Sequence, residues 1–113
     1  MSVERLEMAL AKAEYLLSST APPGEGCDKR KFWREILGFS HPEAVREAVL
    51  AQARPELLEP MQPNAYGQRY QAIIFITGPS GKTKRIKIIW IVLFGEEVAR
   101  CVTAVPQRRR KAL

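Results

Sequence analysis

Residues 66–106 restrict the fold of this 113-residue chain more than any other stretch, because they alone carry continuous β-type patterning. Residues 70–77 and 82–94 are rich in β-branched and aromatic side chains, and a Gly-Pro-Ser-Gly turn separates them. A second turn at residues 95–97 leads to a third such run at 98–105. The pattern predicts a three-stranded antiparallel meander against which the rest of the chain packs.

Three segments before this sheet have helical patterning. Residues 2–17 place apolar side chains at helical spacing, and residues 29–37 do the same before Gly38, a typical helix stop. Residues 40–53 begin with Ser40 and Glu43 at the spacing of a capping box, and residues 56–59 allow one more turn. The sequence therefore predicts an α+β fold, with about three N-terminal helices packed on a C-terminal, three- to four-stranded antiparallel sheet.

The length indicates one domain at residues 1–106, followed by a basic tail at 107–113. Cys27 and Cys101 lack the spacing of a zinc site, so we expect free thiols, no metal and no cofactor. No run approaches the roughly 20 apolar residues of a membrane helix, and acidic residues near the N-terminus argue against a secretory signal. We therefore expect a cytoplasmic protein with no membrane partner.

Positive charge is concentrated in the half of the chain that contains the predicted sheet. Residues 1–60 hold eight Lys/Arg against ten Asp/Glu, a net charge of −2, whereas residues 61–113 hold ten against two, or +8. Such an asymmetry is typical of proteins that meet phosphates or an acidic protein partner. The alternative is that the basic strand faces are simply solvated and discourage edge pairing.

The sequence ITGPSGKT imitates the end of a phosphate-binding P-loop. The motif requires a glycine five residues before Gly81, where Ile76 stands, and a helix after the loop, where the strand pattern KRIKIIWIVLF follows. We therefore interpret residues 78–81 as a hairpin turn. His41, the only histidine, is predicted to lie beside a helix cap, and Glu96 with Glu97 to form a solvated turn rather than an acid/base pair.

Trp33 and Trp90 lie in apolar runs and are predicted to be core residues. If the second helix and the sheet face one another, several polar side chains could form a cationic cleft that attracts a phosphodiester. RNA cleavage needs little more than a positioned 2′-hydroxyl, cations on the phosphate, and a proton acceptor and donor. The side chains that could line this cleft are Lys29, Arg30, Arg69, Arg85, Lys87, Arg100 and Thr103.

The order of several motifs resembles a family of small bacterial domains of unknown function that occur alone and in toxin-like contexts. These motifs are YLLS at 15–18, KRKFWREILGF at 29–39, YGQRY at 66–70, GPSGK at 78–82, WIV at 90–92 and VTAVP at 102–106. Helices followed by an antiparallel sheet and a final TAxP strand also resemble the barnase, EndoU, colicin and RelE superfold of toxin ribonucleases. The resemblance implies catalytic roles for Lys29, Arg69 and Thr103.

Two positions depart from that family pattern. Ala21 stands where the family usually has a histidine, and Ile88 stands where it commonly has a polar threonine. If these positions carry chemistry, the chain is a catalytically degenerate member. The first hypothesis is therefore an RNA-directed domain related to toxin nucleases, active or degenerate. Its rival is a non-catalytic interaction protein, such as an immunity or adaptor module.

Each hypothesis predicts its own surface. The basic side chains of the second predicted strand and of the tail would bind nucleic acid: Lys82, Lys84, Arg85, Lys87, Arg108, Arg109, Arg110 and Lys111. Ile89, Ile91 and Leu93 fall on the sheet face that three helices are not expected to cover. Apolar side chains left in water favour burial, so this face would form a homodimer or bind a protein partner.

Overall fold

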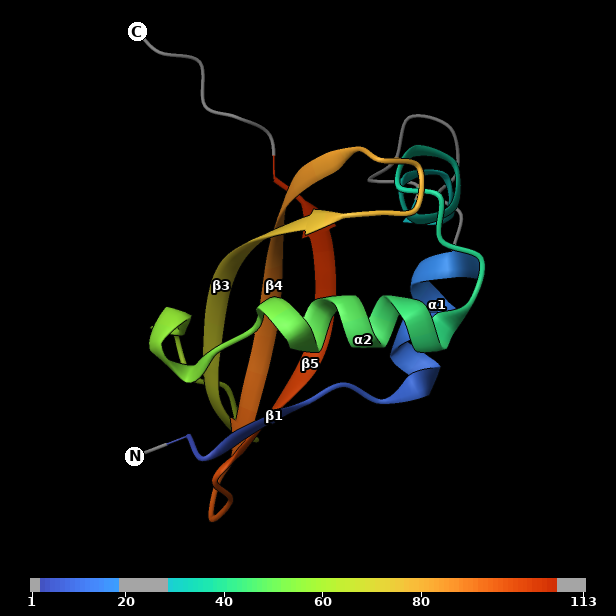
Figure 1. Cartoon of the computed structure of the whole chain (residues 1–113). Coiled ribbons are helices and arrows are strands. Elements are labelled where there is room, and N and C mark those ends of the chain that lie inside the picture. Colours follow the sequence, from blue (N-terminus) through green and yellow to red (C-terminus); the bar gives the residue numbers. More distant parts are fainter. Residues whose placement is uncertain (1–2, 19–28, 108–113) are drawn as a thin grey trace, which may run out of the picture.

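The computed structural model describes residues 3–18 and 29–107. Within these residues one five-stranded sheet has the order β1-β5-β4-β3-β2 (Figure 1). The strands are β1 (Arg5–Glu7), β2 (Glu59–Pro60), β3 (Gly67–Thr77), β4 (Thr83–Leu93) and β5 (Val98–Pro106). The antiparallel β3-β4-β5 meander confirms the prediction. Two short edge strands extend it, β2 antiparallel to β3 and β1 parallel to β5, so the complete sheet is mixed.

The helices precede the meander, and the predicted α+β fold class is confirmed. They are α1 (Leu10–Ser18), the π-helix η1 (Lys31–Ile36), α2 (Pro42–Gln52) and the 3₁₀ turn η2 (Pro55–Leu57). In Figure 1, α2 crosses in front of β4 and β5, whereas α1 and η1 stand on the β5 side of the sheet.

The predicted first helix is wrong over its N-terminal half. Arg5–Glu7 form β1, whose residues pair in register with the first three residues of β5. The amide of Glu4 extends this ladder by donating to the carbonyl oxygen of Glu97 at 2.9 Å. Backbone pairing with the edge of β5 outweighs the local helical spacing, since it satisfies backbone groups on both strands. The helix therefore begins only at Leu10.

The start of α2 also differs from the prediction. The N-cap residue is His41 rather than Ser40, and it has extended backbone angles and no side-chain capping bond. Pro42 takes the first helical turn, where its missing amide hydrogen costs nothing. The predicted position of His41 beside a helix cap is confirmed.

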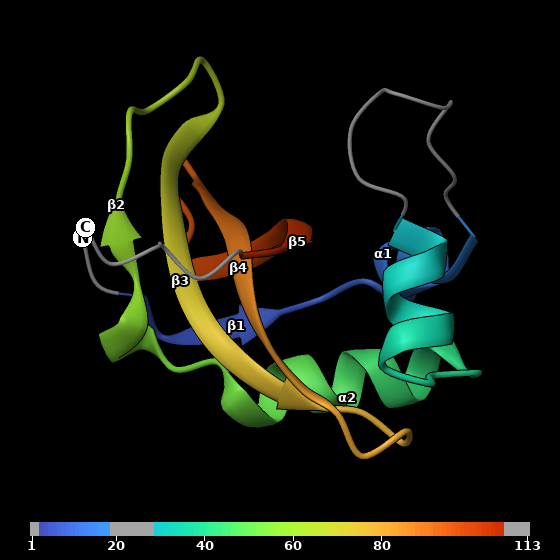
Figure 2. The same cartoon turned by 90° about the horizontal axis from the view of Figure 1, so that it is seen from above.

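One face of the sheet, called here the covered face, packs against the helices (Figure 2). Trp33 of η1 and Trp90 of β4 are both fully buried in this core, as predicted. Alternate side chains of the three long strands complete it, and none of them is charged: Ala72, Ile74, Ile76, Ile86, Ile88, Trp90, Val92, Ala99, Cys101 and Ala104.

Residues 78–81 form the turn between β3 and β4, which confirms the hairpin in place of a phosphate loop. The turn docks on the end of η1. The backbone amide of Ser80 donates to the Leu37 carbonyl oxygen at 3.0 Å, and its Oγ donates to the Ile36 carbonyl oxygen at 2.7 Å. A Cβ at Gly78 would lie 2.1 Å from the Leu37 oxygen, so only glycine permits this approach.

Candidate functional site

The face opposite the helices, called here the open face, carries its polar side chains in rows that follow the strand register. Residues paired directly across neighbouring strands point to the same face. Glu7 of β1 pairs with Arg100 of β5, Arg100 pairs with Ile91 of β4, and Ile91 pairs with Arg69 of β3. This first row therefore crosses four strands and places a carboxylate and two guanidinium groups on one surface.

Three further rows follow along the strands. The second row is Thr103, Ile89, Gln71 and Glu59 of β2. The third is Val105, Lys87 and Ile73, and the fourth is Arg85 and Phe75. The β4–β5 register shifts between Ile89 and Trp90, which leaves Val102 without a pairing partner. Because of this bulge, Thr103 shares the open face with Ile89, while Ala104 and Cys101 keep their places in the core.

The structure brings together most of the side chains that the sequence proposes for a cationic cleft. Arg69, Arg85, Lys87, Arg100 and Thr103 all belong to rows of the open face.

Lys29 and Arg30 do not belong to these rows, because they lie at the start of η1. The Nζ atom of Lys29 is 5.7 Å from the centroid of the Tyr15 ring. In Figure 2, η1 stands beyond the β5 side of the sheet.

The predicted nucleic-acid surface is divided by the strand alternation. Lys84 pairs with Ile76, so its side chain starts on the covered side, and Lys82 lies in the turn. Both are exposed. Arg85 and Lys87 are the two members that lie in rows of the open face. Six positions named from the sequence lie outside the described residues and have no structural account: Ala21, Cys27, Arg108, Arg109, Arg110 and Lys111.

Glu7 is the carboxylate of the first row, and the sequence analysis missed it by placing it in a helix. Its Oε2 atom lies 3.4 Å from a guanidinium nitrogen of Arg100, and its Oε1 atom lies 3.0 Å from Arg5. Arg100 also lies 3.4 Å from Glu96. Glu96 is thus a partner of Arg100, and the predicted absence of a Glu96–Glu97 acid/base pair fits this arrangement.

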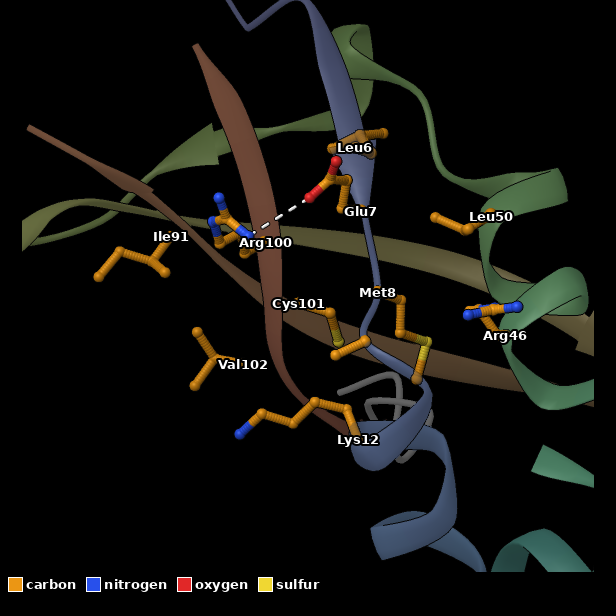
Figure 3. Close-up of a pocket in the computed structure, with 11 residues that line it drawn as sticks. Leu6, Glu7, Met8, Lys12, Arg46, Leu50, Ile91, Arg100, Cys101 and Val102 are labelled. Atoms are coloured by element: carbon orange, nitrogen blue, oxygen red, sulfur yellow. Dashed lines mark hydrogen bonds and ion pairs between the residues drawn. The ribbon is translucent and has the colours of Figure 1, made fainter. Parts of the chain in front are cut away.

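A cavity of about 740 Å³ opens where the first row meets the start of α1 (Figure 3). In the close-up, Glu7, Arg100 and Lys12 surround its apolar side chains. Lys12 is exposed and forms no ion pair with any residue in the described ranges. The cavity is lined by Leu6, Glu7, Met8, Ala9, Lys12, Arg46, Leu50, Ile91, Arg100, Cys101 and Val102.

Cys101 lies in the wall of this cavity but is only 6% exposed. Burial raises the pKa of its thiol from the ordinary 9.0 to about 12, and the positive charge of Lys12 offsets a small part of that rise. The thiol is therefore neutral at physiological pH and is a poor nucleophile.

A second cavity, of about 790 Å³, lies beside the start of β4 and the end of β5, and side chains from both faces of the sheet line it. Phe75 forms part of its wall and is 60% exposed, which is unusual for a large apolar side chain on a sheet. The sequence analysis named the cations here but missed Phe75. The cavity is lined by Phe32, Ile36, Phe75, Thr83, Lys84, Arg85, Pro106 and Gln107.

The apolar part of the open face is less exposed than the sequence suggests. Ile89 is only 7% exposed, so the expectation that it would lie open to water is wrong. Ile91 and Leu93 are half-buried. Neighbouring side chains of the same face and the strong curvature of the sheet in Figure 2 account for this cover.

No helix in the described ranges is long and apolar enough to cross a membrane. No group of three or more His, Cys, Asp or Glu side chains gathers there in a way that could hold a metal ion.

Comparison with known proteins agrees with the fold and with membership of a family of domains of unknown function. A solved structure titled as a contact-dependent growth inhibition toxin–immunity protein complex from Klebsiella pneumoniae 342 contains a similar chain. The TM-score is 0.66 at 18% identity, covering 90% of this chain and 93% of that one, so the likeness concerns the fold. No curated protein matches. The model of a domain of unknown function, DUF6883, matches residues 2–108, and the chain belongs to that family.

Proposed function

We propose that the open face binds RNA and that the chain is a metal-independent ribonuclease of the toxin type. The observation that carries the proposal is the first row, where Glu7, Arg100 and Arg69 share one surface beside a cavity. Arg69 and Arg100 lie two strands apart, about 10 Å between backbones, so both can reach a group held above Ile91. Thr103 is in the adjacent row.

These groups match what cleavage of RNA by its own 2′-hydroxyl requires. The 2′-oxygen forms a bond to phosphorus as its proton passes to the Glu7 carboxylate, and the bond from phosphorus to the 5′-oxygen breaks. Arg69 and Arg100 stabilise the negative charge that builds on the phosphoryl oxygens. The ammonium of Lys12, in the cavity wall, supplies a proton to the departing 5′-oxygen. The products are a 2′,3′-cyclic phosphate and a 5′-hydroxyl.

The position of Ile88 supports an active enzyme over a degenerate one. Its side chain is fully buried on the covered face, away from all four rows. A polar residue at this position would lie in the core and would not reach RNA on the open face. The substitution of the family's threonine by isoleucine therefore removes no group from the proposed site.

The structural neighbour supports the toxin context, since its title names a toxin and an immunity protein in one complex. For this chain we accordingly propose an acidic protein partner that covers the open face. Arg69, Arg85 and Lys87 would attract carboxylates on such a partner, as they would attract phosphates on RNA.

Incubation of the purified protein with end-labelled RNA in the presence of EDTA tests the proposed activity. We expect cleavage that leaves a 2′,3′-cyclic phosphate, and a loss of about 10²- to 10⁴-fold in Glu7→Gln, because a proton acceptor contributes that much. Glu47→Gln removes an equivalent exposed carboxylate from α2 and should retain full activity. Absence of cleavage, or equal cleavage by the two variants, would overturn the proposal.

The second candidate is a non-catalytic interaction module, and one observation favours it. Tyr66 and Phe94 are 72% and 61% exposed, and they lie side by side at the end of β3 and β4, where the Phe94 amide donates to the Tyr66 carbonyl oxygen at 3.1 Å. Half-buried Ile91 and Leu93 offer a separate apolar area on the open face to a partner or a second copy. This candidate predicts no toxicity on expression, and a sedimentation mass that falls in Ile91→Lys.

A further inference from the structure

We infer that Phe75 is a stacking platform for an unpaired base and that it restricts the substrate to single-stranded RNA. The inference rests on the proposed function and deepens it, because it names the class of RNA. Aromatic side chains beside cations are how proteins bind single strands, since every base presents a flat face that can stack on a ring.

The exposure of Phe75 is the first observation. The ring leaves 60% of its surface in water although the same strand buries Ile74 and Ile76 almost completely on the other face. A phenylalanine in that position forgoes most of the stabilisation that burial provides. No aromatic contact of Phe75 is found within the described residues. The ring is therefore accessible to an external planar group.

The charges around Phe75 are the second observation. Arg85 pairs with Phe75 directly across the strands, and Lys87 lies in the adjacent row of the same face. The cavity of about 790 Å³ beside the ring is wide enough for a nucleotide, and Arg85 lines it from the open face while Lys84 lines it from the covered side. A base stacked on Phe75 would thus place its phosphates against cations.

The third observation is that Phe75 and the proposed cleavage site lie on one continuous surface. Phe75 is in the fourth row and Arg69 is in the first, six residues apart along β3. At about 3.3 Å per residue this is about 20 Å, a distance that several nucleotides of an extended strand can span. Lys87 and Thr103 lie between the two ends. Bases inside a duplex are already stacked and cannot reach the ring, so a duplex loses this contact.

The chain provides a matched control. Phe94 is 61% exposed, almost the same as Phe75, and lies just beyond the other end of β4. The chain continues from it into Gly95-Glu96-Glu97, so acidic residues and not cations follow it. Removing Phe94 therefore takes away a similar exposed aromatic area but leaves Phe75, the ring beside the cations, in place.

The experiment measures the affinity of a fluorescent single-stranded RNA of about ten nucleotides, and of the same sequence in a duplex, by anisotropy, with 2′-O-methyl groups in place of the 2′-hydroxyls so that neither RNA can be cleaved. Wild type should prefer the single strand. Phe75→Ala should weaken single-strand binding about 5- to 150-fold and leave duplex binding unchanged, whereas Phe94→Ala should change neither. Phe75→Trp should retain the affinity and show fluorescence quenched by RNA, because Trp33 and Trp90 are buried and the new indole is exposed.

The outcomes separate this inference from the proposed function. If Phe75→Ala binds both RNAs as wild type does while Arg69→Gln binds the single strand weakly, the stacking role of Phe75 is wrong and RNA binding by the open face stands. If wild type binds neither RNA, the proposed function fails and the inference fails with it. If wild type binds duplex and single strand equally, the selection of single strands is refuted.

Discussion

The two faces of the same three strands differ in what their side chains do. On the covered face, the strand residues that form the core are apolar and buried, and they contain no charge. On the open face, cations and polar groups alternate with apolar side chains that are only partly covered, as Lys87 and Ile91 illustrate. Strand alternation sends adjacent residues to opposite faces. A substitution at one position therefore affects the core, whereas a substitution at the next position affects the surface proposed to bind RNA. Paired substitutions in adjacent positions can therefore test each face independently.

The reactivity of the Cys101 thiol should show the largest contrast. Burial raises its pKa to about 12 from 9.0, so at pH 8 the thiolate fraction is about a thousandfold smaller in the folded protein than in the unfolded one. In a Cys27→Ser background, labelling with a disulfide reagent should be slow until denaturant is added. Fast labelling of the folded protein would show that this part of the covered face is open.

The same thiol gives a pH dependence of stability. The unfolded state releases the proton near 9.0 and the folded state keeps it until about 12, so the free energy of unfolding should fall as pH rises above 9.0. Cys101→Ala has no thiol at this position and so lacks this contribution to the pH dependence. Between pH 9 and 10.5 the free energy of unfolding of wild type should therefore fall relative to that of Cys101→Ala. Urea unfolding of both proteins at each pH measures this change.

Ile88→Ala and Ile91→Ala compare the faces within one strand. Ile88 is fully buried on the covered face, and its truncation should cost about 2–5 kcal/mol of unfolding free energy. Ile91 is half-buried on the open face and should cost clearly less. Urea unfolding of both variants at one temperature measures the difference. Equal costs would mean that the open face is as tightly packed as the covered face.

Ser80→Ala should have the smallest effect, about 0.5–1.5 kcal/mol. The substitution removes the 2.7 Å bond to the Ile36 carbonyl oxygen and retains the backbone bond to Leu37 that joins the turn to η1. The variant should bind RNA as wild type does, because the turn serves the covered side. A loss of RNA binding together with unchanged stability would place the turn in the functional site.

Period-2 patterning predicts the meander and the burial of Trp90, because one face of each strand must be buried. The apolar run of the second predicted helix predicts the burial of Trp33. The N-terminal strand could not be predicted, since Arg5–Glu7 is three residues long and its pairing with β5 spans about ninety residues of sequence. That error also hid Glu7. The sequence analysis placed Glu7 in the predicted helix at residues 2–17, whereas the parallel pairing of β1 with β5 places it opposite Arg100.

For the site, strand alternation predicts which residues share a face but not how three strands align. The shift between Ile89 and Trp90 decides that Thr103 faces outward, and no residue type marks it in advance. The sequence therefore identifies Arg69, Lys87 and Thr103 as candidate site residues. It does not predict which side chains lie next to them on the neighbouring strands. The 60% exposure of Phe75 is likewise not given by patterning, which predicts only that its side chain lies opposite Ile74 and Ile76.

The central claim is that RNA binds to the open face, and the salt dependence of binding tests it most directly. Each cation that neutralises a phosphate of a single strand contributes about 0.7 to the slope of log affinity against log salt. We expect Arg69→Gln and Lys87→Gln each to reduce the slope by about that amount, and Arg54→Gln, an exposed cation at the start of η2, to leave it unchanged. Equal slopes for all three variants and wild type would contradict the account.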